Sequence, residues 1–405
     1  MKTFLVTIAV LSLIAMPLLT AEETKIDLSG RLAVGYENQG KGATNTSSFT
    51  VPDAKIQLTG KIAEDVSGVI RLDLNGGIAN DPDYVYISVD NLINKMANTK
   101  SPVNPSIIVG KQKINFGEET YSNNAVENAL VNPSIANISG NDIGITFKQE
   151  DLVPNLPLIL GASLAFYNGN GVVDTNNSKA YGLKVSGTMK SMPLYFSFSS
   201  YTSNKLSTDD TAGTAAVTNT IWNDADQDGV IDAGEVTYLV VPAAPGAPGA
   251  PDAALNVMGV NDSAGGRNWT RKVYELDVRY DLLEGASKFD PSKAPLFSDS
   301  KGVFRLAYGQ ATDGEPVIGK ITYAYVMLDG IYNVDKKWYV AFRYSYNDMA
   351  VDRAPVNDGK WTRISMGGGY RITDNTAMKL DYSQNTEPKP KVDNNSVNLI
   401  FCTKW

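Results

Sequence analysis

The chain has no histidine and only one cysteine among its 405 residues. The missing histidine excludes Ser-His-Asp triads, histidine-based acid–base catalysis and histidine-ligated metal sites. A single cysteine cannot form a disulfide within the chain. An enzyme would therefore need another nucleophile or a clustered acid–base pair, and we expect no enzymatic activity. For a chain with a formal net charge of −8 we also expect no nucleic-acid partner.

Long apolar runs are absent as well, apart from one at the N-terminus. Beyond that run no stretch reaches the roughly 18 consecutive apolar residues of a transmembrane helix. Lys2 precedes an apolar run over 4–19, and the small residue Ala21 comes before two glutamates. This order is typical of a secretory signal peptide. We predict a signal peptide over 1–21, cleaved near Ala21, and an exported protein over 22–405.

The chain instead contains many short runs in which apolar and polar residues alternate. In one of them Ile143, Ile145 and Phe147 are separated by small or polar residues. A period of two predicts a strand with one apolar face. Sixteen such runs occur, at 26–36, 54–63, 67–75, 84–92, 106–114, 141–149, 158–167, 180–190, 193–202, 270–281, 301–310, 320–332, 337–347, 360–371, 375–384 and 395–405. A hidden hairpin within 282–300 would make eighteen strands, and the sequence leaves this open.

The links between these runs alternate in length, which is typical of an outer-membrane barrel with short periplasmic turns and long outer loops. The last run places Val397, Leu399, Phe401 and Trp405 on one face. It resembles the closing strand of bacterial outer-membrane barrels, with odd positions facing lipid and even positions facing the lumen. We therefore predict an all-β fold, a transmembrane antiparallel β-barrel of about sixteen strands with both termini on the periplasmic side. The alternative is a large exported jelly roll or β-helix, which would not explain the terminal aromatic strand.

The loop after the fifth predicted strand carries a family resemblance. From Gly110 to Glu119 the sequence follows the pattern Gly-x-x-(basic)-x-x-Phe-Gly-x-Glu, and residues 168–171 form an Asn-Gly stretch. Both motifs resemble the phosphate-selective porin O/P-like family of Gram-negative outer membranes. The resemblance covers about 100–190 and the closing strand. Asn115 stands where the family has proline. The predicted lumen faces also lack a dense series of arginines, so the resemblance does not imply phosphate selectivity.

The resemblance implies a passive, water-filled channel for small hydrophilic solutes or ions in the bacterial outer membrane, built as a homotrimer. It also implies that the third outer loop, at 115–140, folds inward and narrows the pore. Glu118, Glu119 and Glu127 would then lie at the constriction, where fixed charges determine which solutes pass. Basic residues on the predicted lumen faces would lie opposite these glutamates: Arg31, Lys55, Lys61, Arg71, Arg279, Arg305, Arg343 and Arg363. The alternative is that these are ordinary wet lumen residues that pair with nearby acids.

A second motif has the spacing of a calcium site. Residues 224–235 match the EF-hand loop at every ligand position, with Gly229 at the sharp turn. The oxygen ligands would be the carboxylates of Asp224, Asp226, Asp228, Asp232 and Glu235 and the backbone carbonyl of Val230. We predict that one Ca²⁺ binds here in a structural role. The alternative is an acidic, solvated turn.

The calcium motif belongs to a long surface loop over 203–269, an insert within the barrel that also contains a Pro/Ala/Gly run at 242–251. Loops of this length are usually functional or disordered. The chain therefore has a second interpretation, as a surface adhesin or interaction protein that uses the barrel as a mount for a calcium-ordered loop. A purified protein that forms no channels would favour this alternative.

Overall fold

The structure is a computed structural model. It describes residues 25–39, 47–75, 82–97, 101, 103–169, 178–203, 217–222, 236–241, 256–257, 270–283, 289–315, 319–351, 359–386 and 395–405. The predicted signal peptide at 1–21 and the predicted calcium loop at 224–235 lie outside the described residues.

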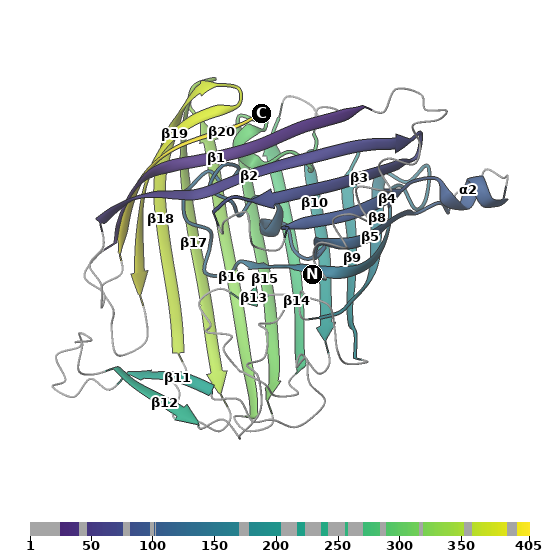
Figure 1. Ribbon diagram of the computed structural model, residues 1–405. Coiled ribbons are helices and arrows are strands. Elements are labelled where there is room, and N and C mark those ends of the chain that lie inside the picture. The colour runs from purple at the N-terminus through teal and green to yellow at the C-terminus, as the bar shows by residue number, and fades with distance from the viewer. Residues whose placement is uncertain are drawn as a thin grey trace.

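Sixteen strands of the described part of the chain form one closed antiparallel barrel, in which each strand pairs with the next and the last pairs with the first. The strands are β1 (Ile26–Gln39), β2 (Ser47–Ala63), β3 (Val66–Asp73), β4 (Tyr84–Val89), β5 (Ser106–Lys113), β7 (Asn141–Gln149), β8 (Leu158–Tyr167), β9 (Ala180–Met189), β10 (Leu194–Ser203), β14 (Thr270–Leu282), β15 (Gly302–Glu315), β16 (Gly319–Asn333), β17 (Trp338–Val351), β18 (Gly359–Thr373), β19 (Thr376–Thr386) and β20 (Ser396–Lys404). Figure 1 shows the ring, which closes where β1 lies beside β20. The predicted all-β barrel of sixteen strands is confirmed.

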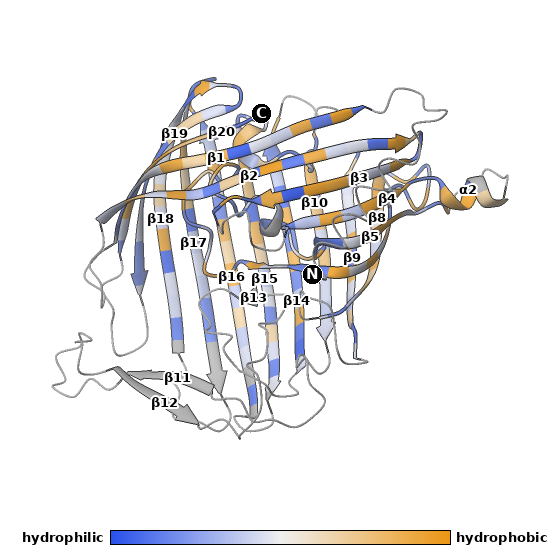
Figure 2. Ribbon diagram, in the orientation of Figure 1, coloured by the Kyte–Doolittle hydropathy of each residue, from blue (hydrophilic) through white to orange (hydrophobic). Residues whose placement is uncertain are grey.

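Apolar side chains face outward along these strands and polar side chains face the lumen. In β20, Leu399 and Phe401 are exposed on the outer face, whereas Asn398 and Cys402 are buried. Figure 2 shows the same alternation as orange and blue bands along the strands. In water an exposed apolar surface costs about 25 cal/mol for each Å², whereas a lipid bilayer accepts it. The outward face is therefore built for lipid.

The two sides of the barrel differ in strand length. β3, β4 and β5 have 8, 6 and 8 residues, whereas β14 to β18 each have 13 to 15. A strand of about 9–11 residues crosses a bilayer, so the β14–β18 side extends beyond the lipid-facing band. Polar residues such as Lys272 and Gln310 occupy exposed positions near the outer ends of these strands.

The other described elements are short. They are α2 (Leu92–Ala97), η1 (Glu119–Tyr121), η3 (Pro295–Phe297), the pair β6 (Ile138–Ser139) and β13 (Asn256–Val257), and the pair β11 (Val217–Trp222) and β12 (Val236–Val241). Among the described residues, no helix has the length and apolar character needed to cross a membrane. In the link where the sequence allowed a hidden hairpin, the described residues 289–300 contain η3 and no strand.

One strand, β2, starts several residues earlier than the sequence predicted. β2 begins at Ser47, seven positions before residue 54, because it continues through Pro52. Proline cannot donate a hydrogen bond to a neighbouring strand and therefore interrupts a strand pattern. The structure accommodates it where the pairing with β1 shifts register between Ala33 and Gly35.

Candidate functional site

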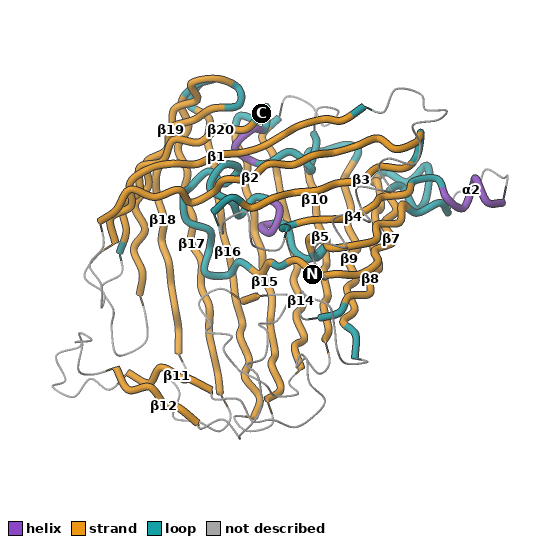
Figure 3. Tube along the Cα trace, in the orientation of Figure 1, coloured by secondary structure: helices purple, strands orange, loops and turns teal. Residues whose placement is uncertain are grey.

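Residues 114–137, named the inner loop here, follow β5 and lie inside the barrel. At one side the Lys184 Nζ of β9 donates to the Gly117 carbonyl at 2.8 Å. At the other side the Lys379 Nζ of β19 donates to the Val126 carbonyl at 2.8 Å. β9 and β19 are separated by six barrel strands in one direction and eight in the other. The inner loop therefore crosses the lumen, and Figure 3 shows it in teal among the orange strands.

The inner loop begins with a turn that requires glycine. Gly117 has a φ of +62°, and a Cβ at this position would lie 2.2 Å from Glu275 Oε1 on β14. Its N–H donates to the Ser199 hydroxyl of β10 at 3.0 Å, and the preceding Phe116 is buried. The Phe-Gly pair of the sequence motif thus fixes the start of the inner loop against the β10–β14 wall.

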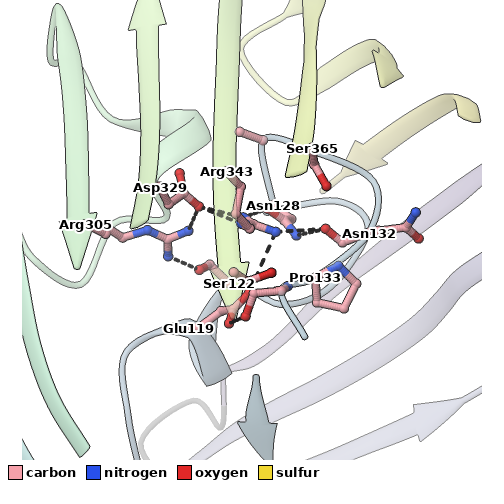
Figure 4. Close-up of polar contacts among 12 residues, drawn as sticks. Glu119, Ser122, Asn128, Asn132, Pro133, Arg305, Asp329, Arg343 and Ser365 are labelled. Carbon is pink, nitrogen blue, oxygen red and sulfur yellow. Dashed lines mark hydrogen bonds and ion pairs between the residues drawn. The ribbon is translucent and has the colours of Figure 1, made fainter. Parts of the chain in front are cut away.

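A buried arginine pair holds the middle of the inner loop (Figure 4). Asp329 on β16 accepts from Arg305 and from Arg343, each at 2.6 Å. Arg305 donates its other Nη to the Ser122 hydroxyl at 2.7 Å. Arg343 donates to the Asn132 carbonyl at 2.8 Å. Both arginines were predicted to be lumen charges, and the structure uses them to anchor the inner loop.

Three other predicted lumen bases do not line the cavity described below and have different surroundings. Arg363 on β18 donates to Asn385 Oδ1 at 2.7 Å and to the Pro133 carbonyl at 3.2 Å. Arg279 on β14 pairs with Asp281 at 2.8 Å, near a periplasmic link. Lys61 is exposed near the periplasmic end of β2.

The remaining predicted bases line a cavity of about 900 Å³ between the inner loop and the wall. Its basic side chains are Arg31, Lys55, Arg71, Lys113, Lys148, Lys184 and Lys404, and its acidic side chains are Glu118, Glu127, Glu150 and Asp290. Aromatic residues complete the lining: Tyr84, Tyr86, Tyr121, Tyr195, Phe289 and Trp405. The polar, charged lining is what a water-filled path for hydrophilic solutes needs.

The bases on β1 to β3 are paired with carboxylates. Arg31 lies 2.6 Å from Asp53. Asp83, just before β4, lies 2.7 Å from Lys55 and 2.6 Å from Arg71. Burial acts to raise the pKa of Asp83, but the adjacent guanidinium and ammonium outweigh it and hold the pKa below its usual range. Lys55 also lies 3.0 Å from Asp73, so three carboxylates face three bases and this part of the wall is close to neutral.

The three predicted glutamates have different surroundings. Glu118 lines the cavity and lies 2.7 Å from Lys184. Glu127 also lines it and lies 3.9 Å from Lys404. Glu119 is only 4% exposed and does not line the cavity. Its carboxylate turns into the inner loop, because it accepts from the Ser134 N–H at 2.8 Å.

The sequence prediction missed Lys113, Lys148 and Lys404, which line the cavity, and two lysines that hold the inner loop, Lys184 and Lys379. Both are almost fully buried and contact the inner loop. A signal was present, because each occupies a lumen-facing position in the alternation of its strand. The alternation does not predict the path of the inner loop. That path determines whether a basic side chain in the lumen faces water or binds backbone carbonyls of the inner loop.

Comparison with known proteins agrees with this architecture. A model of the phosphate-selective porin O and P family matches residues 26–240. OmpT of Vibrio cholerae in a trimer form matches with a TM-score of 0.58 and 12% identity over 95% of this chain and 100% of that chain. The anion-selective porin from Comamonas acidovorans matches with a TM-score of 0.53 and 12% identity over 95% and 100%. The outer membrane channel DcaP of Acinetobacter baumannii matches with a TM-score of 0.55 and 10% identity over 94% and 97%.

No curated protein sequence matches the chain. Identities near a tenth show a shared fold alone, whereas the family model spans more than half of the chain. The closed barrel with an apolar outer face and a polar lumen is the architecture of an outer-membrane channel. The chain belongs to the phosphate-selective porin O and P family, and it is a non-enzymatic outer-membrane porin that passes small solutes or ions.

Proposed function

We propose that solutes cross the barrel through the cavity beside the inner loop, with weak selectivity for charge. The observation that carries this proposal is charge pairing, because six bases that line the cavity each lie 2.6–3.9 Å from a carboxylate. These are Arg31, Lys55, Arg71, Lys148, Lys184 and Lys404. The field of a paired wall is short-ranged, since the Debye length is about 8 Å at physiological ionic strength. Ions of both signs can then enter.

The two partners of each charged pair differ in exposure. On the barrel wall Arg31 is more exposed than its partner Asp53, with side-chain exposures of 18% and 4%. On the inner loop Glu118 is more exposed than its partner Lys184, with exposures of 19% and 8%. At these two pairs a solute meets a base on the wall and a carboxylate on the inner loop, whereas at Lys148 and Glu150, which also line the cavity, the acid is the more exposed partner, with exposures of 51% and 71%. Small neutral and zwitterionic solutes suit such a path as well as simple ions do.

Liposome swelling tests this function. Liposomes that contain the purified protein swell when an added solute enters, and the rate reports permeability. We expect similar rates for small hydrophilic solutes of equal size with charges of −1, 0 and +1. Rates that are high for one charged solute and near zero for the other would contradict weak selectivity. No swelling with any solute would contradict the channel and favour the adhesin alternative.

We also propose that the mature protein, after removal of residues 1–21, assembles as a homotrimer. Family membership supports this, and so does the OmpT structure with the same fold, which is described as a trimer form. Native mass spectrometry in detergent is expected to give three copies per particle. N-terminal sequencing is expected to begin near Glu22. A single copy per particle, or an intact Met1, would contradict the respective proposal.

A structural Ca²⁺ in the 224–235 loop is a further proposal, and its support is the spacing of the sequence. Five carboxylates and one carbonyl recur at the EF-hand positions. They are supplied by Asp224, Asp226, Asp228, Asp232, Glu235 and Val230. Bound Ca²⁺ would offset the repulsion between these carboxylates and order the 203–269 surface loop.

A further inference from the structure

Lys379 on β19 points its ammonium group into the inner loop. The Nζ atom donates to the backbone carbonyls of Ala125 and Val126 at 2.8 Å each and to that of Asn128 at 2.6 Å. An ammonium group has three N–H donors and no acceptor, so these carbonyls use all of its donors. The side chain is 1% exposed. The ammonium therefore has a complete set of partners away from bulk water.

The three carbonyls converge because residues 124–128 form one hydrogen-bonded turn. The Asn124 side-chain oxygen accepts from the Val126 N–H at 3.1 Å, and the Asn124 carbonyl accepts from the Asn128 N–H at 3.0 Å. Carbonyls at the end of a single turn have no hydrogen-bond partner inside it. The turn thus presents a cup of oxygens, named the carbonyl cup here, that suits a cation.

The surroundings of the carbonyl cup are mostly apolar and offer few other hydrogen-bond donors that could replace the ammonium. Buried apolar residues pack around it: Ala33, Ala125, Val126, Val131, Ala377, Ile400 and Cys402. Next to it Asp381, on the same face of β19, accepts the Val131 N–H at 2.6 Å. A carbonyl left unpaired in such a place carries the desolvation cost of a buried polar group.

We propose that the carbonyl cup is a cation-binding site that the protein fills with the ammonium of its own Lys379, and that this contact sets the position of the inner loop and the width of the channel. The proposal rests on the solute path proposed above. Lys379 is not among the residues that line the cavity. It is therefore a positioning residue, which acts on solutes through the inner loop.

The chemistry of the carbonyl cup suggests a rescue experiment. Lys379→Ala removes a three-carbon chain and its ammonium, which together correspond to propylammonium. Added propylammonium can donate three hydrogen bonds to the carbonyl cup. Tetramethylammonium carries the same charge but has no N–H donor, so it cannot replace them. The exposed Lys272 of β14 provides a matched control, Lys272→Ala.

Single-channel recording in planar bilayers measures the outcome. We expect one steady open level for the wild type and for Lys272→Ala, and an altered, fluctuating level for Lys379→Ala. Propylammonium is expected to restore the steady level and tetramethylammonium is not. An unchanged level in Lys379→Ala, or equal effects of the two ammonium ions, would overturn the proposal.

A second variant covers a failure of Lys379→Ala to fold. Lys379→Arg keeps the charge but presents a wider, planar group that fits three convergent carbonyls poorly, so an altered level is expected and an unchanged level overturns the proposal. A wild-type protein that forms no channels would instead overturn the proposed function, which keeps the two failures distinct.

Discussion

Glu118 on the inner loop and Lys184 on β9 lie 2.7 Å apart where the inner loop meets the cavity. Lys184 also donates to the Gly117 carbonyl, and Glu118 also accepts from the Tyr195 hydroxyl at 2.5 Å. The pair therefore fixes the start of the inner loop. In this pair the ammonium of Lys184 compensates the charge of the Glu118 carboxylate, which faces the solute path.

Glu118→Gln is expected to shift ion selectivity toward anions, because it leaves the charge of Lys184 uncompensated at the cavity. The reversal potential in asymmetric KCl measures this shift. Glu127→Gln is expected to shift it in the same direction. Glu64→Gln, in an exposed periplasmic turn, is the control. An equal shift in the control, or none in Glu118→Gln, would place Glu118 outside the ion path.

Glu119→Gln is expected to leave the reversal potential unchanged, because this carboxylate is buried and does not line the cavity. Its loss removes a charged acceptor from the Ser134 N–H and a carboxylate 3.7 Å from Arg343. We expect the free energy of unfolding to fall by about 1–3 kcal/mol, measured by denaturant titration in detergent. A clear change in reversal potential with no loss of stability would contradict this assignment.

The wall beside β4 is expected to lose stability in acid. Because the pKa of Asp83 is depressed in the folded protein, its contribution is fully present above the ordinary aspartate pKa of about 4 and is lost as pH falls below it. The thermal unfolding midpoint between pH 7 and pH 3 measures this. Asp83→Asn is expected to lower the midpoint at pH 7 and to flatten its pH dependence. An unaltered pH profile in Asp83→Asn would show that other groups cause the acid effect.

The calcium loop is tested by limited proteolysis. Ca²⁺ is expected to protect the 203–269 segment from cleavage while the barrel is unaffected, since its strand ladder closes without this segment. Glu235→Gln is expected to weaken protection most, because it removes the bidentate ligand. Asp209→Asn, an acid outside the motif, is the control. Equal cleavage with Ca²⁺ and with chelator would identify the motif as an acidic, solvated turn.

The fold was readable from the sequence because lipid on one side and water on the other force a period of two along every strand. That is why runs such as 141–149 and 158–167 coincide with β7 and β8. The predicted β2 was too short, because Pro52 interrupts the alternation of apolar and polar residues near the start of the strand.

The site was only partly readable, because the roles of lumen side chains depend on the path of the inner loop. Arg343 and Arg31 look equivalent in their strands, yet one binds inner-loop atoms and the other lines the cavity. Glu119 and Glu118 are neighbours, yet only Glu118 reaches the cavity. Such differences arise from contacts between residues more than 200 positions apart, such as Asn132 and Arg343, which no local pattern encodes. The signal peptide and the calcium loop stay predictions.

Paired charges are expected to make this porin weakly selective, and the reversal potential of the wild-type channel tests this expectation most directly. A perfectly selective channel for a monovalent ion gives roughly 59 mV across a tenfold KCl gradient at 25 °C. We predict a reversal potential close to zero, well below that limit, which moves toward the anion side in Glu118→Gln. A wild-type reversal potential near this limit, of either sign, would contradict weak selectivity.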